Sequence, residues 1–251
     1  MVEKYNVWYE PAGENRRLYV YLPDNYYESR ERYPVVYMFD GQNVFFNEDA
    51  TYGTCWGMKE FLDGWWKKVI VVGIECAQDA RRLSEYCPYD VQLSFSGDAV
   101  EGLGDVTFKW LIQSLKKHID KTYRTYPLRE CTAIAGSSMG GLMAMYGVLH
   151  YNEYFSKAAV VSPAISDVYE QLLDEFNNHE IIPDTRVFFS WGTDEWPGHS
   201  MAGLSKKIYG LEKELQKHWC TTYIYCNKGG VHNEASWRKE IPTWMHFMWA
   251  E

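Results

Sequence analysis

The 251-residue chain has little that would direct it to a membrane or to a nucleic acid. No run approaches the roughly 18 consecutive apolar residues of a membrane-spanning helix, and the first residues are too polar for a signal peptide. With 34 acidic and 25 basic residues, the net charge of −9 argues against nucleic acid or an anionic membrane as the main partner. We therefore expect a cytoplasmic protein with neither a membrane nor a nucleic-acid partner.

The chain also lacks the cysteine pairs and the glycine patterns that would indicate a disulfide framework or a nucleotide-binding site. The six cysteines include no C-x-x-C pair, and Cys76 and Cys131 lie at or beside the ends of predicted core strands, so we expect free thiols in a reducing compartment. No dinucleotide-binding or Walker-type glycine pattern is present, and no metal or cofactor is implied. Since no linker, charge block or repeat divides the chain, we expect a single domain over residues 1–251.

Apolar runs and amphipathic stretches alternate along the chain. Continuous apolar runs predict buried strands, and apolar residues spaced three to four apart predict helices. The predicted strands span residues 6–10, 17–22, 35–39, 69–74, 131–135, 158–162, 187–191 and 221–226. The predicted helices span residues 58–65, 105–123, 142–149, 168–176, 204–218 and 233–249, the last interrupted or kinked at Pro242. This alternation predicts an α/β fold with a mainly parallel central sheet, helices on both faces, and a site at the carboxyl ends of the strands.

The most informative motif is Gly136-Ser-Ser-Met-Gly140, a G-x-S-x-G pattern centred on Ser138. An apolar run precedes it and a helical stretch follows, which is the context of a nucleophile elbow. At such a turn the central side chain projects from strained backbone, so the flanking positions need residues without bulk, and glycine has no Cβ. Ser138 is therefore the candidate nucleophile for acyl transfer. The alternative is a glycine-rich turn that only packs a helix closely against a strand.

A serine hydroxyl needs a base within hydrogen-bond reach, and histidine has a pKa close to working pH. Most of the seven histidines lie on or at the ends of predicted helices, where packing or solvation is the usual role; these are His118, His150, His179, His218 and His246. His199, in a loop after Glu195, is a weaker candidate. His232 follows the last predicted strand in a glycine-bearing loop, which is where the Ser, acid, His chain order places the base.

The remaining members of the predicted site follow other strands. Asp194 and Glu195 both follow the strand at 187–191, and either would orient the imidazole; spacing does not choose between them. The oxyanion of a tetrahedral intermediate needs two N–H donors. We expect them from the backbone of Met139, directly after the nucleophile, and of Gln42, in the loop after the strand at 35–39.

Several segments together resemble the putative esterase family of α/β-hydrolases, which includes feruloyl and acetylxylan esterases, siderophore-ester hydrolases and S-formylglutathione hydrolase. They are residues 39–45, 71–74, 82–86, 119–124, 133–141, 192–195 and 229–234. The resemblance implies an α/β-hydrolase fold with Ser138 as nucleophile, His232 as base and Gln42 at the oxyanion-loop position. The family places its acid fourth in a G-T-x-[D/E] segment, which favours Glu195 over Asp194, although some relatives use a Ser–His dyad.

The same resemblance places Arg82 and Glu85 in a structural loop near the site, without a catalytic role. Trp56, Trp191, Trp196 and Trp237 lie in or beside segments predicted near the site, where indole rings could form a wall for an aryl or sugar group; core packing is the alternative for each.

These residues predict a serine carboxylesterase that acts on small-molecule or carbohydrate esters, with acetyl and feruloyl esters of carbohydrate as candidates. A second interpretation is an acyltransferase, in which an alcohol outcompetes water for the acyl-enzyme. A third is a non-catalytic protein that keeps the fold and binds carbohydrate on its aromatic surface.

Overall fold

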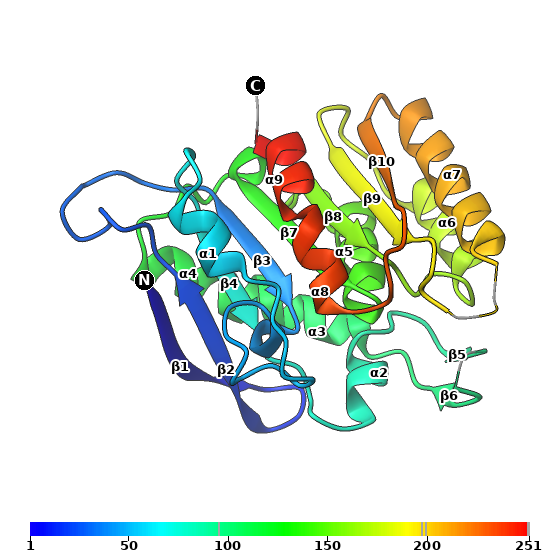
Figure 1. The fold of residues 1–251 in the computed structure, drawn as a ribbon, viewed down its shortest axis with the longest axis horizontal. Helices are drawn as coiled ribbons and strands as arrows, with labels where there is room; N and C mark the ends of the chain where they lie inside the picture. The colour runs from blue at the N-terminus through cyan, green and yellow to red at the C-terminus, as the bar shows by residue number, and fades with distance from the viewer. Residues whose placement is uncertain (95, 197, 199, 250–251) are drawn as a thin grey trace.

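In the computed structural model, which describes residues 1–94, 96–196, 198 and 200–249, eight strands form one sheet in the order β1-β2-β4-β3-β7-β8-β9-β10 (Figure 1). They are β1 (Val2–Tyr9), β2 (Glu14–Tyr21), β3 (Val35–Phe39), β4 (Ile70–Ile74), β7 (Thr132–Ser137), β8 (Lys157–Val161), β9 (Arg186–Gly192) and β10 (Thr221–Asn227). β2 runs antiparallel to β1 and β4, and all other neighbours are parallel. His199 lies outside the described residues.

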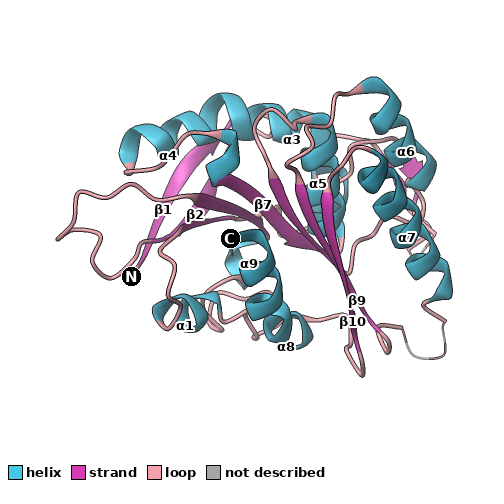
Figure 2. Cartoon of the chain, turned by 90° about the horizontal axis from the view of Figure 1, so that it is seen from above, coloured by secondary structure: helices cyan, strands magenta, loops and turns pink. Residues whose placement is uncertain are grey.

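Helices cover both faces of this sheet, with α3, α4, α5, α6 and α7 on one face and α1, α8 and α9 on the other (Figure 2). The helices are α1 (Met58–Asp63), α2 (Arg81–Glu85), α3 (Gly104–Trp110), α4 (Lys117–Thr122), α5 (Met139–His150), α6 (Tyr169–Asn178), α7 (Ala202–Lys217), α8 (Glu234–Trp237) and α9 (Ile241–Trp249). Each face has its own apolar core. Strands covered on both sides need apolar residues throughout, as in β3 and β4. The predicted α/β-hydrolase architecture is confirmed.

Two predicted helices differ in detail. The helix expected at 105–123 consists of α3 and α4 joined by a π-helical segment, Leu111–Lys116. The interruption expected at Pro242 lies before that residue, in a 3-10 turn at Arg238–Glu240 between α8 and α9. Pro242 occupies the first turn of α9, where a missing N–H removes no intrahelical hydrogen bond.

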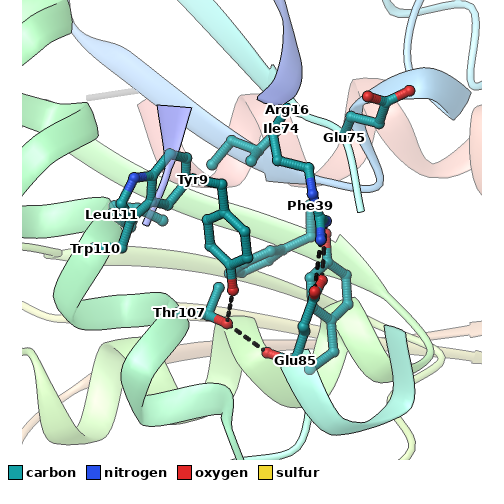
Figure 3. A pocket seen from close by; sticks show the side chains of 10 residues that line it. Tyr9, Arg16, Phe39, Ile74, Glu75, Glu85, Thr107, Trp110 and Leu111 are labelled. Carbon is teal, nitrogen blue, oxygen red and sulfur yellow. Dashed lines mark hydrogen bonds and ion pairs between the residues drawn. The ribbon is translucent and has the colours of Figure 1, made fainter. Parts of the chain in front are cut away.

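Residues 82–86, expected in a structural loop, mostly form helix α2, which is anchored through Glu85. The Arg16 guanidinium donates to Glu85 Oε2 at 2.9 Å, and the Thr107 hydroxyl donates to the Glu85 carbonyl at 2.9 Å (Figure 3). Tyr9 lies beside this pair, its hydroxyl 2.8 Å from Thr107 Oγ1. These buried contacts tie α2 to the start of β2 and to α3, and so place Arg82 beside the end of β3.

The described residues include no helix that is both long enough and apolar enough to cross a bilayer. A short two-stranded ribbon, β5 (Val91–Gln92) with β6 (Ala99–Val100), lies outside the main sheet. All six cysteines are free, as predicted, and four of them are buried: Cys55, Cys76, Cys87 and Cys220.

Candidate active site

Ser138 occupies the turn between β7 and α5, with φ 56° and ψ −122°. A non-glycine residue in such a conformation carries a backbone strain of about 1–3 kcal/mol, which surrounding contacts must offset. The Ser138 N–H donates to the Val161 carbonyl at 3.1 Å, and the Ala164 N–H donates to the Ser138 carbonyl at 3.0 Å. The end of β8 and the loop that follows it thus hold both sides of the strained residue. Strand, turn and helix follow one another as the motif predicts.

Gly136 and Gly140, the glycines of the motif, are required because other atoms of the protein lie very close to where a Cβ would stand. A Cβ on Gly136 would lie 2.4 Å from the Gly140 carbonyl oxygen, and a Cβ on Gly140 would lie 3.1 Å from Phe39 Cβ. Larger residues at either position would push the turn apart, because the start of α5 packs against both β7 and the end of β3.

His232 and Glu195 are paired at the same edge of the sheet. They follow β10 and β9, and His232 Nδ1 lies 3.0 Å from Glu195 Oε2. The Glu195 side chain is only 1% exposed, and the His232 side chain is 19% exposed. The other carboxylate oxygen, Oε1, accepts hydrogen bonds from the Gly192 N–H and the Ser162 hydroxyl, both at 2.6 Å. Three donors thus compensate a buried carboxylate and hold it in one orientation.

Asp194, the alternative acid, is placed differently. Its N–H donates to the Gly230 carbonyl at 2.9 Å, while its exposed carboxylate accepts from the Thr193 hydroxyl at 2.8 Å. The structure therefore brings Glu195 rather than Asp194 against the imidazole, in agreement with the family pattern.

Ser162 is a site residue that the sequence analysis missed. It directly follows β8 with φ 43°, and its hydroxyl bridges Glu195 Oε1 and the Trp237 Nε1–H, which donates to it at 2.9 Å. A Ser-Pro pair directly after a buried strand was the available signal, because it marks a turn at the edge of the sheet that carries the other predicted residues.

Two of the four tryptophans considered from the sequence flank the imidazole. Trp196 stacks on the His232 ring with centroids 5.1 Å apart and 29° between the planes, and Trp237 approaches edge-on at 5.1 Å and 84°. Trp56 packs against Trp237 and is buried, and Trp191 belongs to the core. Trp196 is half exposed and so is the one of these rings that faces solvent.

The two predicted oxyanion donors lie on neighbouring elements. Met139 begins α5, and a first-turn N–H has no acceptor within its own helix. Gln42 lies in the 3-10 turn Gly41–Asn43 after β3, and its side-chain amide donates to Cys76 Sγ at 3.2 Å. A Cβ on Gly41 would lie 2.4 Å from the Gly73 carbonyl carbon, so this turn packs directly onto β4.

An ion pair fixes the start of that turn. Asp40 has φ 56°, and its carboxylate accepts two hydrogen bonds from Arg82, both at 2.7 Å. Burial acts to lower the pKa of Arg82, but the charge and hydrogen bonds of Asp40 outweigh it, so the guanidinium pKa lies above its ordinary value. Arg82 therefore stays charged at any physiological pH and holds the turn.

Two further carboxyl groups are buried beneath the His232 loop. Burial raises the pKa of Glu234, whose Oε1 accepts from the Asn43 side chain at 3.0 Å. Burial also raises the pKa of Glu240 to about 7, an effect that the Glu195 charge increases and the Asn227 hydrogen bond reduces. The latter runs from Asn227 Nδ2 to Glu240 Oε1 at 2.9 Å.

Ser138 and His232 both line two cavities, of about 530 and 570 Å³, so they lie where the two meet. Most residues that line the first have polar or charged side chains, which include Asp40, Gln42, Asn43, Thr51, Gln78, Asp79, Arg82 and Glu234. The second has an apolar part formed by Pro163, Ala164, Trp196, Met201 and Leu204.

Comparison with known proteins gives a family and similar folds. The sequence model of the family described as "Putative esterase" matches residues 10–248. "Uncharacterized protein YbbA" of Bacillus subtilis (strain 168) is 25% identical in an alignment of 256 positions, gaps included, that covers 96% of each protein. The IroE-like serine hydrolase of Shewanella oneidensis superposes with a TM-score of 0.78 at 20% identity, over 98% of this chain and 79% of that one. The siderophore hydrolase EstA of Aspergillus nidulans gives 0.68 at 16% identity, over 96% of this chain and 93% of that one.

Proposed function

Because the chain belongs to the putative esterase family, we propose that residues 1–251 form one serine carboxylesterase domain that works through an acyl-enzyme on Ser138. The observation that supports this most directly is the junction of the two cavities. There a serine on strained backbone and a histidine paired to a buried glutamate lie on the same cavity walls. Strained backbone at a serine and burial of a carboxylate both cost free energy, and the proposed chemistry gives a reason for each.

In the first half-reaction, Glu195 accepts the Nδ1–H of His232, which leaves Nε2 free to take the Ser138 proton as the hydroxyl attacks the ester carbonyl. The N–H groups of Met139 and Gln42 stabilise the oxyanion of the tetrahedral intermediate. The imidazolium then protonates the leaving alkoxide, and the C–O bond to the alcohol breaks. The acyl group remains on Ser138.

In the second half-reaction, His232 removes a proton from water, which attacks the acyl carbon. The imidazolium then returns this proton to Ser138 Oγ as the bond to the acyl carbon breaks and the carboxylic acid leaves. The His232 side chain is 19% exposed, and both cavities reach it, so water has access to the base. This favours hydrolysis over acyl transfer, since an acyltransferase has to keep water from its acyl-enzyme. Products formed with and without an added alcohol separate the two activities.

The two cavities suit an ester with one polar and one apolar side. Polar and charged side chains in the first cavity can hydrogen-bond the hydroxyl groups of a sugar alcohol. The apolar part of the second, with the half-exposed Trp196, suits an aryl or acetyl group. We therefore propose acetyl or feruloyl esters of carbohydrate as substrates, and the similarity to EstA adds siderophore esters to the set that should be compared by kcat/KM.

The test is turnover of an activated aryl acetate by Ser138→Ala, with Ser137→Ala as matched control. Ser137 is adjacent, buried and on the wall of the polar cavity, but its backbone is that of the strand end. We expect kcat to fall by about 10⁴-fold or more in S138A, and by less than about 10-fold in S137A. Unchanged turnover by S138A would refute the proposal.

A further inference from the structure

Three titratable side chains meet at the far ends of α5 and α6, away from the cavities. His150 is the last residue of α5, His179 directly follows α6, and Glu175 lies one turn before it. Glu175 Oε2 lies 2.9 Å from the Nδ1 of His150 and 2.9 Å from the Nδ1 of His179. The centroids of the two imidazole rings are 4.0 Å apart. Two nitrogens therefore converge on one carboxylate oxygen.

His150 Nδ1 is hydrogen-bonded to Glu175 Oε2, but one imidazole nitrogen of the cluster has no hydrogen bond to any residue that the structure describes. Within the described residues, His179 Nδ1 is buried and makes no hydrogen bond, although Glu175 Oε2 is close, because the approach is not aligned for one. A buried imidazole nitrogen without a partner has a substantial desolvation cost. A bound cation would remove that cost by coordinating the nitrogen lone pair.

The surroundings resemble the outer partners of a metal site. Glu175 Oε1 accepts from the Tyr89 hydroxyl at 2.9 Å, which fixes the carboxylate. Asp105 Oδ1 lies 3.9 Å from His150 Nε2, beyond hydrogen-bond distance, and its negative charge favours a cation bound to this imidazole. The Tyr146 hydroxyl in turn donates to Asp105 Oδ1 at 3.1 Å.

The local field also favours a cation. The carboxyl ends of two helices, each with a negative partial charge, converge here. A cavity of about 220 Å³ opens on both imidazoles, and the acidic residues Glu153 and Glu180 line it. Water in this cavity can take a remaining coordination position.

From this arrangement we propose that His150, Glu175 and His179 bind a divalent transition metal, with Zn²⁺ as the best match. Two imidazoles and a carboxylate are an established zinc donor set. The three ligand atoms lie within 4.8 Å of one another. A tetrahedral ion with bonds of about 2.0–2.1 Å needs its donors about 3.3 Å apart, so small side-chain rotations complete the site.

The site is separate from the ester chemistry. His150 ends α5 and Ser138 directly precedes its first residue, so at about 1.5 Å per residue the two lie roughly 18 Å apart. A metal here clamps α5 to α6, and we expect it to stabilise the fold without changing the ester chemistry.

The test is isothermal titration of Zn²⁺ into metal-free protein. The chelator-treated wild type should bind one Zn²⁺ per chain at the cluster. The variants His179→Gln and Glu175→Gln should bind it at least about 100-fold more weakly. His246→Gln, which removes an exposed histidine from another helix, is the matched control and should bind as the wild type does. Circular dichroism of the metal-free variants checks that they are folded.

Thermal denaturation supplies an independent readout. Zn²⁺ should raise the Tm of the wild type and of H246Q, and leave the Tm of H179Q and E175Q unchanged. No binding by the wild type, or equal affinity and Tm shift in H179Q and E175Q, would overturn the proposal. In the latter case the ion binds elsewhere, for example at the exposed Cys226.

Discussion

Replacing Glu240 with glutamine should change how the stability of this protein depends on pH. Glu240 is 1% exposed, lies in the turn between α8 and α9, and accepts a hydrogen bond from Asn227 Nδ2 through Oε1. Its second oxygen, Oε2, is buried without a hydrogen-bond partner in the described part of the chain. Glutamine keeps the shape and the acceptor, but it cannot ionise.

The magnitude follows from the pKa difference between the folded and unfolded states. Burial raises the pKa of Glu240 from 4.5 to about 7, so between these pH values the folded protein keeps a proton that the unfolded chain has lost. The contribution of Glu240 to the free energy of unfolding therefore falls as pH rises from 4.5 to about 7. At higher pH this contribution is constant. A difference of 2.5 pKa units corresponds to about 3 kcal/mol.

Urea denaturation of the wild type and of Glu240→Gln at several pH values from 5 to 9 measures this effect. The two free energies of unfolding should be similar at pH 5, and the variant should be more stable by about 3 kcal/mol at pH 8. The exposed Glu10→Gln serves as the control and should follow the wild type throughout. If the difference between wild type and E240Q does not change with pH, Glu240 is ionised in the folded protein and the reasoning is wrong.

Two further predictions concern the acid and the elbow. Glu195→Gln should lower kcat by about 10³-fold, because the imidazole loses the carboxylate that stabilises its protonated form, whereas Asp194→Asn, at the exposed neighbour, should change kcat by less than about 3-fold. Steady-state kinetics with an aryl acetate distinguishes them, and equal losses would contradict the assignment. Gly136→Ala should destabilise the fold by about 3 kcal/mol, since its Cβ would lie 2.4 Å from the Gly140 carbonyl oxygen. Gly203→Ala lies in α7 with open space around the added Cβ and should not destabilise the fold. Chemical denaturation of the two variants measures this difference.

Much of the architecture could be predicted because its signals are local. The apolar runs at β3 and β4 are buried on both faces. Most ends of the sheet's eight strands were predicted to within one residue. The break before α9 was harder, because proline is tolerated in the first turn of a helix and so marks a start as readily as a kink. The π-helical segment between α3 and α4 carries no distinctive residue and was not predicted.

Most of the candidate-site residues that follow strands of the parallel sheet could be predicted from the sequence. Ser138 and His232 line the same cavities, in keeping with their predicted positions directly after strands of one sheet. The choice of Glu195 over Asp194 came from a family pattern, since neighbouring loop carboxylates differ only in side-chain direction. Ser162 was missed because its role depends on a hydrogen bond to a residue 33 positions away.

The central claim is that the Ser138 hydroxyl is the activated nucleophile. Treatment with a fluorophosphonate followed by peptide mass spectrometry tests it directly, since the probe reacts with a serine only where a base removes its proton. We predict one adduct per chain, located on Ser138, formed much more slowly in His232→Gln and absent in S138A. Stoichiometric labelling of another residue, or no labelling of a folded wild-type protein, would contradict the account.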